Sequence, residues 1–152
     1  MSVVARLKEA AFDPAEELAA LMRSSVDEGA VVSFVGVTRS EGSAAGKIKT
    51  LTLEHHPRLT SKSLEDIAHD AADRFAISHV RIIHRCGALR PGEAIVFAGA
   101  SSAHRRDAFE AADYLMDRLK TEAVLWKRED GEHGSVWIEP TADDYADRTR
   151  WE

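Results

Sequence analysis

Single helices alternate with pairs of short strands along this chain, and this order constrains its fold more than any one motif. Runs rich in β-branched and apolar residues predict strands at residues 30–37, 48–55, 80–84, 94–100, 123–127 and 135–138. Apolar residues at helical spacing predict three main helices, beginning near residues 13, 60 and 104. Strand pairs separated by single helices indicate an α+β fold, a two-layer structure with mostly antiparallel strands. We expect one domain over residues 1–152, long enough to bury a core without disulfides.

Local signals predict where the helices begin, which faces they bury and where the chain turns. Asp13 can cap the first helix and Pro14 suits its first position. The apolar faces expected to be buried are Leu18, Leu21 and Met22 on the first helix, Leu64, Ile67, Ala68, Ala71 and Phe75 on the second, and Ala108, Phe109, Ala112, Leu115, Met116 and Leu119 on the third. We also expect a loop at residues 40–47, a type II turn at 90–93 and a hairpin turn at 130–134.

The charge and cysteine content argue against several classes of function. Lys and Arg number 20 against 26 Asp and Glu, a net charge of −6, which argues against nucleic-acid binding through a broad basic face. The one cysteine, Cys86, cannot form an internal disulfide, which fits a reducing compartment. The first residues lack the apolar core of a signal peptide, and no apolar run approaches the roughly 20 residues that span a bilayer. We therefore expect a cytoplasmic protein with neither a nucleic-acid nor a membrane partner.

The spacing of the histidines along the chain argues against a metal site. His55 and His56 are adjacent in a predicted strand, so their side chains point to opposite faces and cannot easily share an ion. His69 and His84 lie on different predicted elements, and the sequence contains neither an HExxH pattern nor a second cysteine. We interpret Cys86 as a small buried residue and expect no metal.

The start of the third predicted helix is a candidate anion site. In the segment Ser101-Ser102 a serine can cap, and His104, Arg105 and Arg106 follow at the point where the first-turn amides have no helical partners and the helix dipole is positive. Cations in a first turn oppose that dipole at a cost of about 0.3–1 kcal/mol each, which favours a functional reason for them. The alternative is a solvated polar turn, neutralised by nearby acidic residues.

Two lysines and one arginine are further candidates. Lys120 near the end of a helix, Lys127 in a strand and Arg39 at the end of another strand are each ordinary surface charges when taken alone. If Lys120 and Lys127 lie together beside Trp126, each disfavours protonation of the other, and one of them can then act as a base or nucleophile. Both interpretations remain open on these residues.

Five segments, in order along the chain, resemble the large, catalytic subunit of molybdopterin synthase over nearly its whole length. They are residues 29–35 with Arg39 beyond them, LTLEHHP (51–57), IIHRCGALRPGE (82–93), SSAHRRDAFEA (101–111) and MDRLKTEAVLWKRE (116–129). The order of the motifs makes the resemblance specific. The chain departs from the residues common in the family at His56, at Arg58-Leu59 and at Val124-Leu125, which bear on the shape of the pocket.

The resemblance implies a sulfurtransferase of molybdenum cofactor biosynthesis with the α/β-hammerhead-like fold of that family. It implies a homodimer of large subunits with one small ubiquitin-like sulfur carrier docked at each distal end, forming a heterotetramer. The carrier's C-terminal Gly-Gly, as a thiocarboxylate, would supply two sulfurs to cyclic pyranopterin monophosphate and so form the dithiolene of molybdopterin. The resemblance implies no cofactor.

Residue roles are also implied by position in the family's motifs. Lys120 and Lys127 would be the catalytic pair. The substrate-binding residues would be both lysines with Val37, Thr38, Arg39, His104, Arg105, Arg128 and Glu129. Interpretations from other classes remain: a non-catalytic module that binds an anion or nucleotide, and a scaffold that only docks the carrier.

The length of the third helix has a consequence for any shared site. His104 and Lys120 are separated by 16 residues, so at 1.5 Å rise per residue they lie roughly 24 Å apart. A pterin monophosphate does not span that distance. Either the two ends are separate sites, or the helix start of one subunit completes the pocket of its partner, and we expect the second arrangement.

Overall fold

Two sheets and four helices make up the described part of the chain, which covers residues 1–42 and 45–152 in a computed structural model. The strands are β1 (Ser2–Lys8), β2 (Ala30–Val37), β3 (Ile48–His55), β4 (His79–Arg85), β5 (Gly87–Leu89), β6 (Ala94–Ser102), β7 (Leu125–Gly131) and β8 (Gly134–Ile138). The helices are α1 (Pro14–Ser24), α2 (Leu59–Arg74), α3 (Arg105–Glu122) and α4 (Ala142–Thr149). The first sheet has the order β1-β4-β6-β2 and the second β5-β3-β7-β8.

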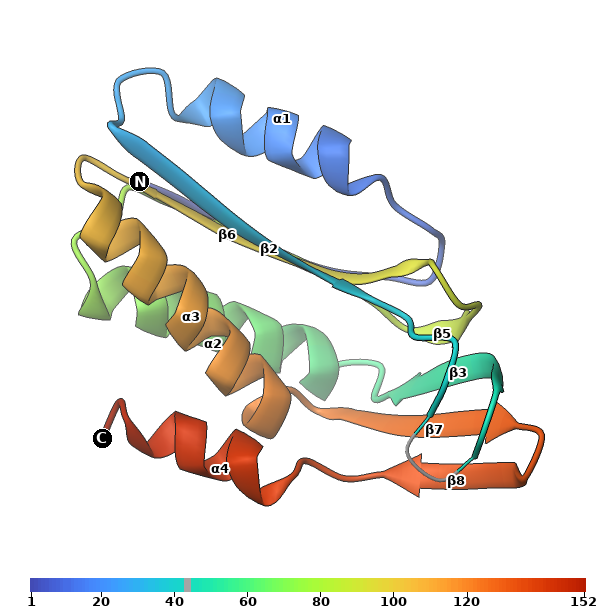
Figure 1. Ribbon diagram of the computed structural model, residues 1–152. Helices are drawn as coiled ribbons and strands as arrows, with labels where there is room; N and C mark the ends of the chain where they lie inside the picture. Colours follow the sequence, from blue (N-terminus) through green and yellow to red (C-terminus); the bar gives the residue numbers. More distant parts are fainter. Residues whose placement is uncertain (43–44) are drawn as a thin grey trace.

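Helices cover the first sheet on both faces, with α1 on one side and α2 and α3 on the other (Figure 1). The adjacent residues Ile82 and Ile83 of β4 are both fully buried, which a strand permits only when both of its faces are covered. Ile82 belongs to the core shared with Leu64 of α2 and Leu115 of α3, whereas Ile83 packs with Leu21 of α1. Each such side chain contributes roughly 1.5–3 kcal/mol by its burial.

The α+β class and the mostly antiparallel pairing are confirmed. The one parallel pair among the named strands is β1 with β4, in the register Val3 to Val80, and the second sheet is antiparallel throughout. The structure adds two strands that the sequence analysis did not predict, β1 and the short β5, and α1 adds a third layer to the two expected. The second sheet lies at one end of the first, beyond the last turn of α3 (Figure 1).

The apolar stripe predicted for α1 is wrong at two of its three positions. Leu21 is buried, but Leu18 is 37% and Met22 54% exposed. The buried face of α1 is rotated so that Glu17 lies against the sheet, where its Oε1 is 3.0 Å from Nη2 of Arg81 on β4. Apolar spacing predicts that a glutamate faces water, but the ion pair with Arg81 buries Glu17. The spacing alone therefore predicted the wrong buried face for α1.

On α3 the predicted core face is confirmed except at its first aromatic residue. Phe109 is 57% exposed and Met116 only half buried. The buried residues of this helix follow a stripe of three- and four-residue steps, namely Ala108, Ala111, Ala112, Tyr114, Leu115 and Leu119. Phe109 lies outside that stripe, on the exposed side of the helix.

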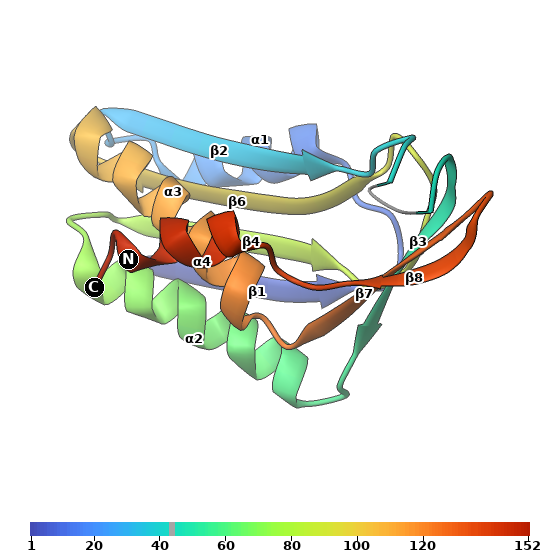
Figure 2. The ribbon, with the colours of Figure 1, turned by 60° about the horizontal axis from the view of Figure 1, so that its bottom comes forward.

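The C-terminal residues form a helix that the sequence analysis did not predict. Thr141 and Asp144 make a reciprocal capping box at the start of α4. After α4, Trp151 stacks edge-on against Phe75 and Tyr114, at ring centroid distances of 5.7 and 5.5 Å. These contacts place α4 beside α3 (Figure 2), next to the start of β7.

Two of the predicted turns are confirmed. In the turn at 90–93 the Glu93 amide donates to the Arg90 carbonyl and Gly92 has φ of +89°, the left-handed conformation that a type II turn requires. The hairpin turn is confirmed as well, although β7 begins two residues later than predicted because Ala123 still caps α3. Within the loop expected at 40–47, residues 43 and 44 lie outside the described residues.

Within the described part of the chain, no helix is both long enough and apolar enough to cross a membrane.

Candidate active site

Lys127 lies within the second sheet, on β7. Leu53 of β3 is its partner on one side and Ile138 of β8 on the other. Because successive side chains of a strand face opposite ways, Glu129 shares the face of Lys127 and Arg128 does not. The lysine side chain therefore projects from a rigid, doubly paired strand.

The pKa of Lys127 is lowered, and the causes identify its neighbours. Burial has the largest effect, and the positive charge of Lys120 lowers the pKa further. The carboxylates of Asp144 and Glu129 oppose this shift, while the guanidinium of Arg39 adds to it. We call these five residues, Arg39, Lys120, Lys127, Glu129 and Asp144, the lysine cluster.

The fold brings the lysine cluster together from four separate elements. Arg39 follows the end of β2, Lys120 lies in the last turn of α3, and Asp144 lies in the first turn of α4. After α3, Ala123 adopts an extended conformation and redirects the chain into β7. Lys127 thus follows Lys120 by seven positions in the sequence. The change of chain direction at Ala123 brings the two side chains close enough for the charge of Lys120 to lower the pKa of Lys127.

His84 is a buried member of the same region. Its exposure is 8%, and its Nδ1 lies 2.8 Å from the carbonyl oxygen of Arg85. A carbonyl only accepts, so Nδ1 carries the proton and Nε2 keeps its lone pair. Burial lowers the pKa of His84 to about 4; the Arg85 carbonyl opposes the shift, and Lys127 and Lys120 add to it. The imidazole is therefore neutral at neutral pH and lies within range of both lysines.

The depressed pKa of His84 predicts a loss of stability in acid. An unfolded histidine titrates near its ordinary value of 6.5, so between about pH 6.5 and 4 the unfolded chain binds more protons than the folded one. Stability is fully present above pH 6.5 and falls as pH drops through about 4, by up to about 3 kcal/mol. Urea unfolding from pH 7 to 4 measures this loss.

The control for this experiment is His84→Asn, which retains a donor for the Arg85 carbonyl but does not titrate. Protonation of carboxylates also destabilises the protein in acid, so the measured quantity is the difference in pH dependence between the two proteins. Equal slopes for both would show that His84 does not bring about the loss.

Two buried polar side chains, Glu129 of the lysine cluster and Thr38 next to Arg39, each have an oxygen without a partner in the described part of the chain. Glu129 is 5% exposed and Thr38 3% exposed. Among the described residues, Oε1 of Glu129 and Oγ1 of Thr38 have no hydrogen-bond partner. A Cβ on Gly42 would lie 2.4 Å from Oε1 of Glu129, so a larger residue at position 42 would require this carboxylate to move. Each unsatisfied group costs about 1–3 kcal/mol, a cost that hydrogen bonds from a ligand would offset.

Other residues predicted for the site do not join this cluster within one chain. Arg128 faces the other side of β7, where its Nε is 3.0 Å from Oδ1 of Asp130 and its guanidinium lies 5.5 Å from the Trp137 ring. Val37 is half exposed and lines a depression with Phe12, which contains no residue of the lysine cluster.

The predicted anion site lies at the far end of α3. His104 is the exposed residue that caps the helix, and its amide donates to Oγ of Ser102 at 3.3 Å. Neither serine is the N-cap residue, because Ser101 and Ser102 are both buried at the end of β6, and the His104 side chain makes no capping hydrogen bond. Arg105 begins α3 and Lys120 lies in its last turn, so the roughly 24 Å separation predicted from the sequence applies. One chain does not unite the two half-sites.

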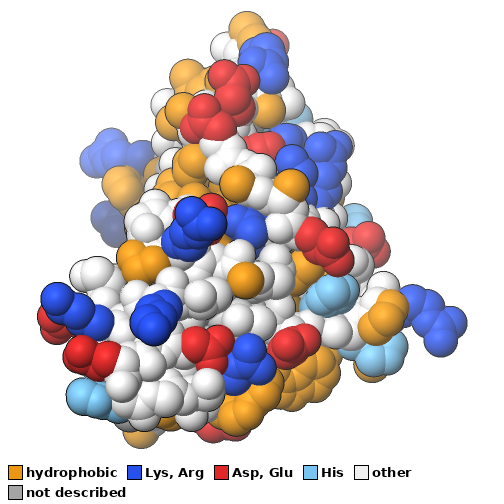
Figure 3. All heavy atoms as spheres, turned by 90° about the vertical axis from the view of Figure 1, so that its right-hand side faces the viewer, with side chains coloured by type: hydrophobic (Ala, Val, Ile, Leu, Met, Phe, Trp, Pro, Cys, Tyr) orange, Lys and Arg blue, Asp and Glu red, His pale blue; other side chains and the backbone are white. Residues whose placement is uncertain are grey.

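The lysine cluster can bind an anion and move protons. A lysine with a lowered pKa exchanges protons nearer to neutral pH than an ordinary one, and a neighbouring ammonium stabilises a developing oxyanion. The end of the molecule that carries the second sheet mixes acidic, basic and histidine side chains (Figure 3), so the cluster is a local feature and not part of a uniformly basic face.

Sequence analysis missed three residues of this region: His84, Gly42 and Asp144. The pattern Thr141-x-x-Asp144 is a helix-start signal that could have revealed α4. Nothing local indicates that His84 faces the lysines, because that depends on how the two sheets meet.

Comparisons with known proteins agree with these observations. Residues 7–122 match the family model described as MoaE protein. The chain is 45% identical to the molybdopterin synthase catalytic subunit of Caulobacter vibrioides over 150 residues, covering 99% of this chain and 98% of the relative. It is 46% identical to the same subunit of Pseudomonas aeruginosa over 149 residues, covering 97% of each chain. The solved structure of molybdopterin cofactor biosynthesis protein E from Burkholderia multivorans superimposes with a TM-score of 0.81 at 37% identity, covering 99% of this chain and 97% of the other.

Proposed function

Because this chain belongs to the MoaE family, we propose that it is the catalytic subunit of molybdopterin synthase. In this role it transfers two sulfurs from the thiocarboxylated C-terminus of a small carrier subunit to cyclic pyranopterin monophosphate. The relatives' printed name, catalytic subunit, supports an enzymatic role and implies at least one further subunit. A homodimer with a carrier at each end, located in the cytoplasm, is part of the same proposal.

The observation that carries the proposal is the pairing of Lys127 with Lys120. The protein has a net charge of −6, so two neighbouring lysines are not explained by its overall charge. Burial and the charge of Lys120 lower the pKa of Lys127, which indicates a site where positive charge and proton exchange are concentrated. These are the two properties that a thiocarboxylate donor and a phosphorylated acceptor require.

Four residues of the lysine cluster have a role in this proposal. Arg39 contributes charge for the substrate phosphate, and His104 and Arg105 of a partner subunit complete that contact. Lys120 stabilises the thiocarboxylate and the oxyanion that develops on it. Lys127 supplies and recovers protons as a C–O bond of the substrate gives way to a C–S bond. The carboxylate of Glu129, whose Oε1 has no partner among the described residues, accepts hydrogen bonds from the substrate.

The proposal is tested by incubating the purified chain with thiocarboxylated carrier and pterin precursor. We expect a product that contains the dithiolene, detected by mass, together with carrier returned to its carboxylate form. A scaffold would bind the carrier without forming product, and an anion-binding module would bind the precursor without consuming the thiocarboxylate. Either result would contradict the proposal.

A further inference from the structure

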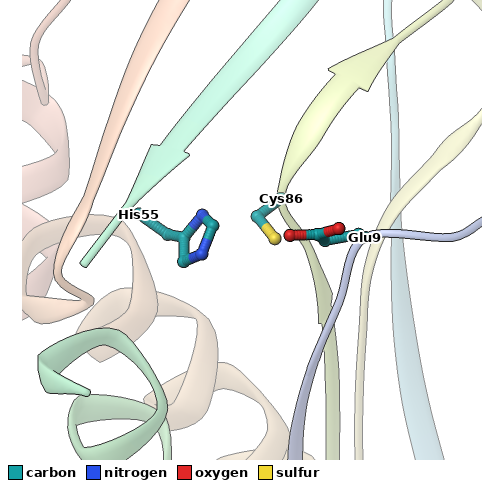
Figure 4. Close-up of side chains that lie close together, drawn as sticks. All are labelled: Glu9, His55 and Cys86. Atoms are coloured by element: carbon teal, nitrogen blue, oxygen red, sulfur yellow. The ribbon is translucent and has the colours of Figure 1, made fainter. Parts of the chain in front are cut away.

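Three potential metal ligands meet at the junction of the two sheets, outside the lysine cluster. Glu9 follows β1 directly, His55 is the last residue of β3, and Cys86 lies between β4 and β5. One donor atom from each, a carboxylate oxygen, an imidazole nitrogen and the sulfur, lie within 4.8 Å of one another (Figure 4). The residues are far apart in sequence, so only the tertiary structure assembles this group.

The backbone holds two of the three residues in place. The Cys86 amide donates to the carbonyl of Lys8 at 2.9 Å, which fixes the Cys86 segment against the end of β1. Nη2 of Arg85 donates to the carbonyl of Glu9, also at 2.9 Å. His55 is positioned independently by its pairing with Leu125 in the second sheet. The donors are therefore supported by rigid strand ends.

Burial decreases from the sulfur outwards. Cys86 is 1% exposed, His55 is half buried and Glu9 is exposed. An ion can approach from solvent past the flexible carboxylate and reach a thiol that is shielded from bulk water. Since the Glu9 side chain is exposed, its carboxylate has room to close the remaining gap between the donors.

The donor set suits Zn²⁺ better than a hard cation. Zinc binds thiolate sulfur at about 2.3 Å, imidazole nitrogen at about 2.0–2.1 Å and carboxylate oxygen at about 2.0–2.2 Å in tetrahedral geometry. Those bond lengths place the donor atoms roughly 3.3–3.7 Å apart, so a contraction of about 1 Å from 4.8 Å completes the site. A thiolate and a carboxylate together neutralise the charge of the ion, and water fills the fourth position.

We propose that Glu9, His55 and Cys86 form a zinc site that ties the end of β1 and the β4–β5 connection to β3. This replaces the expectation of no metal, which considered ligand spacing along the chain and excluded Cys86 for want of a second cysteine. The site uses none of the lysine cluster and does not depend on the proposed sulfur transfer. Because the ion would join residues of both sheets, it would stabilise the contact between the first and the second sheet.

The test is a Co²⁺ titration of the full chain after chelator treatment, under a reductant that does not bind metals. We expect saturation at one ion per chain, with a thiolate-to-cobalt charge-transfer band and the strong visible bands of tetrahedral coordination. Addition of Zn²⁺ should abolish both. Zn²⁺ should also raise the melting temperature of the wild-type chain, because an ion that binds only the folded state stabilises it.

The variants separate this site from incidental binding. Cys86→Ser should remove the charge-transfer band and the thermal shift, while Glu9→Gln, a change at an exposed side chain that keeps the fold, should weaken Zn²⁺ binding at least about tenfold. His69→Ala, at an exposed histidine on α2, serves as the matched control and should bind as wild type does. The proposal is overturned if the wild type shows no charge-transfer band, or if Glu9→Gln binds Zn²⁺ with unchanged affinity.

Discussion

Replacing Lys127 with alanine should reduce product formation by about 10²- to 10⁴-fold, the range of a lost acid–base group, while substrate binding changes little. The reason is that the lowered pKa of Lys127 matters where a proton moves, whereas the proposal assigns the substrate phosphate to Arg39, His104 and Arg105. Lys120→Ala should also lower turnover far more than binding. Steady-state kinetics with varied precursor separates the two: kcat falls and KM stays near its wild-type value.

Matched controls make this prediction specific. Lys62→Ala removes an exposed lysine of α2 that pairs with its helical neighbour Asp66, and it should leave kcat unchanged. Lys127→Arg keeps the positive charge but replaces a lysine of lowered pKa with a guanidinium that does not release its proton, so the variant should remain slow. If Lys120→Ala raised KM as much as it lowered kcat, Lys120 would be a binding residue and not a catalytic one.

Mixing two inactive chains should restore activity. In a composite pocket, Lys120 of one subunit acts with His104 and Arg105 of its partner across the two-fold axis. A heterodimer of Lys120→Ala and Arg105→Ala chains then has one pocket with both residues lost and one with both intact. Random exchange makes half of the dimers mixed, so we expect about one quarter of wild-type activity.

The length of α3 is the physical basis of this expectation. Its first and last turns lie too far apart for one substrate, yet both carry residues implied in binding it. Exchange is verified by native mass spectrometry of chains that differ in a tag, and each chain alone serves as the background. Dimers shown to have exchanged without any recovery of activity would make the two ends of α3 separate sites.

Exposed aromatic residues on β2 and α3 are consistent with a partner subunit on these elements. Phe34 and Phe109 are 43% and 57% exposed, and β2 is an edge strand whose outer side pairs with no other named strand. Apolar side chains next to an unpaired strand edge are a liability in a monomer. The wrong prediction that Phe109 is buried within the chain is thus accounted for if a partner covers it.

Much of the fold follows from local sequence, because its signals act over a few residues. Asp13-Pro14 sets the start of α1, Pro91-Gly92 sets a type II turn, and the β-branched run of residues 30–37 forms β2. Local signals gave wrong predictions where a residue distant in sequence determines which side chain is buried. Glu17 turns inward because Arg81 lies beneath it, a contact between residues 64 positions apart.

For the site, the sequence by itself determined which side chains are available and on which kind of element each lies. Lys120 near a helix end, Lys127 in a strand and Arg39 after a strand are all where the pattern placed them. Only the tertiary structure decided which of them meet, because the approach of charges from separate elements depends on how the sheets pack. That packing lowers the pKa of Lys127 and buries Glu129 unpaired.

The same reasoning applies to the donors at the sheet junction. The sequence did not predict a metal site at Glu9, His55 and Cys86, because metal-binding motifs are recognised from ligands a few residues apart and these three are far apart. Three strand ends bring them together, because hydrogen bonds between strands fix positions that are distant in sequence. Sequence sets what each residue can do chemically, and the packing of the two sheets sets which residues act together.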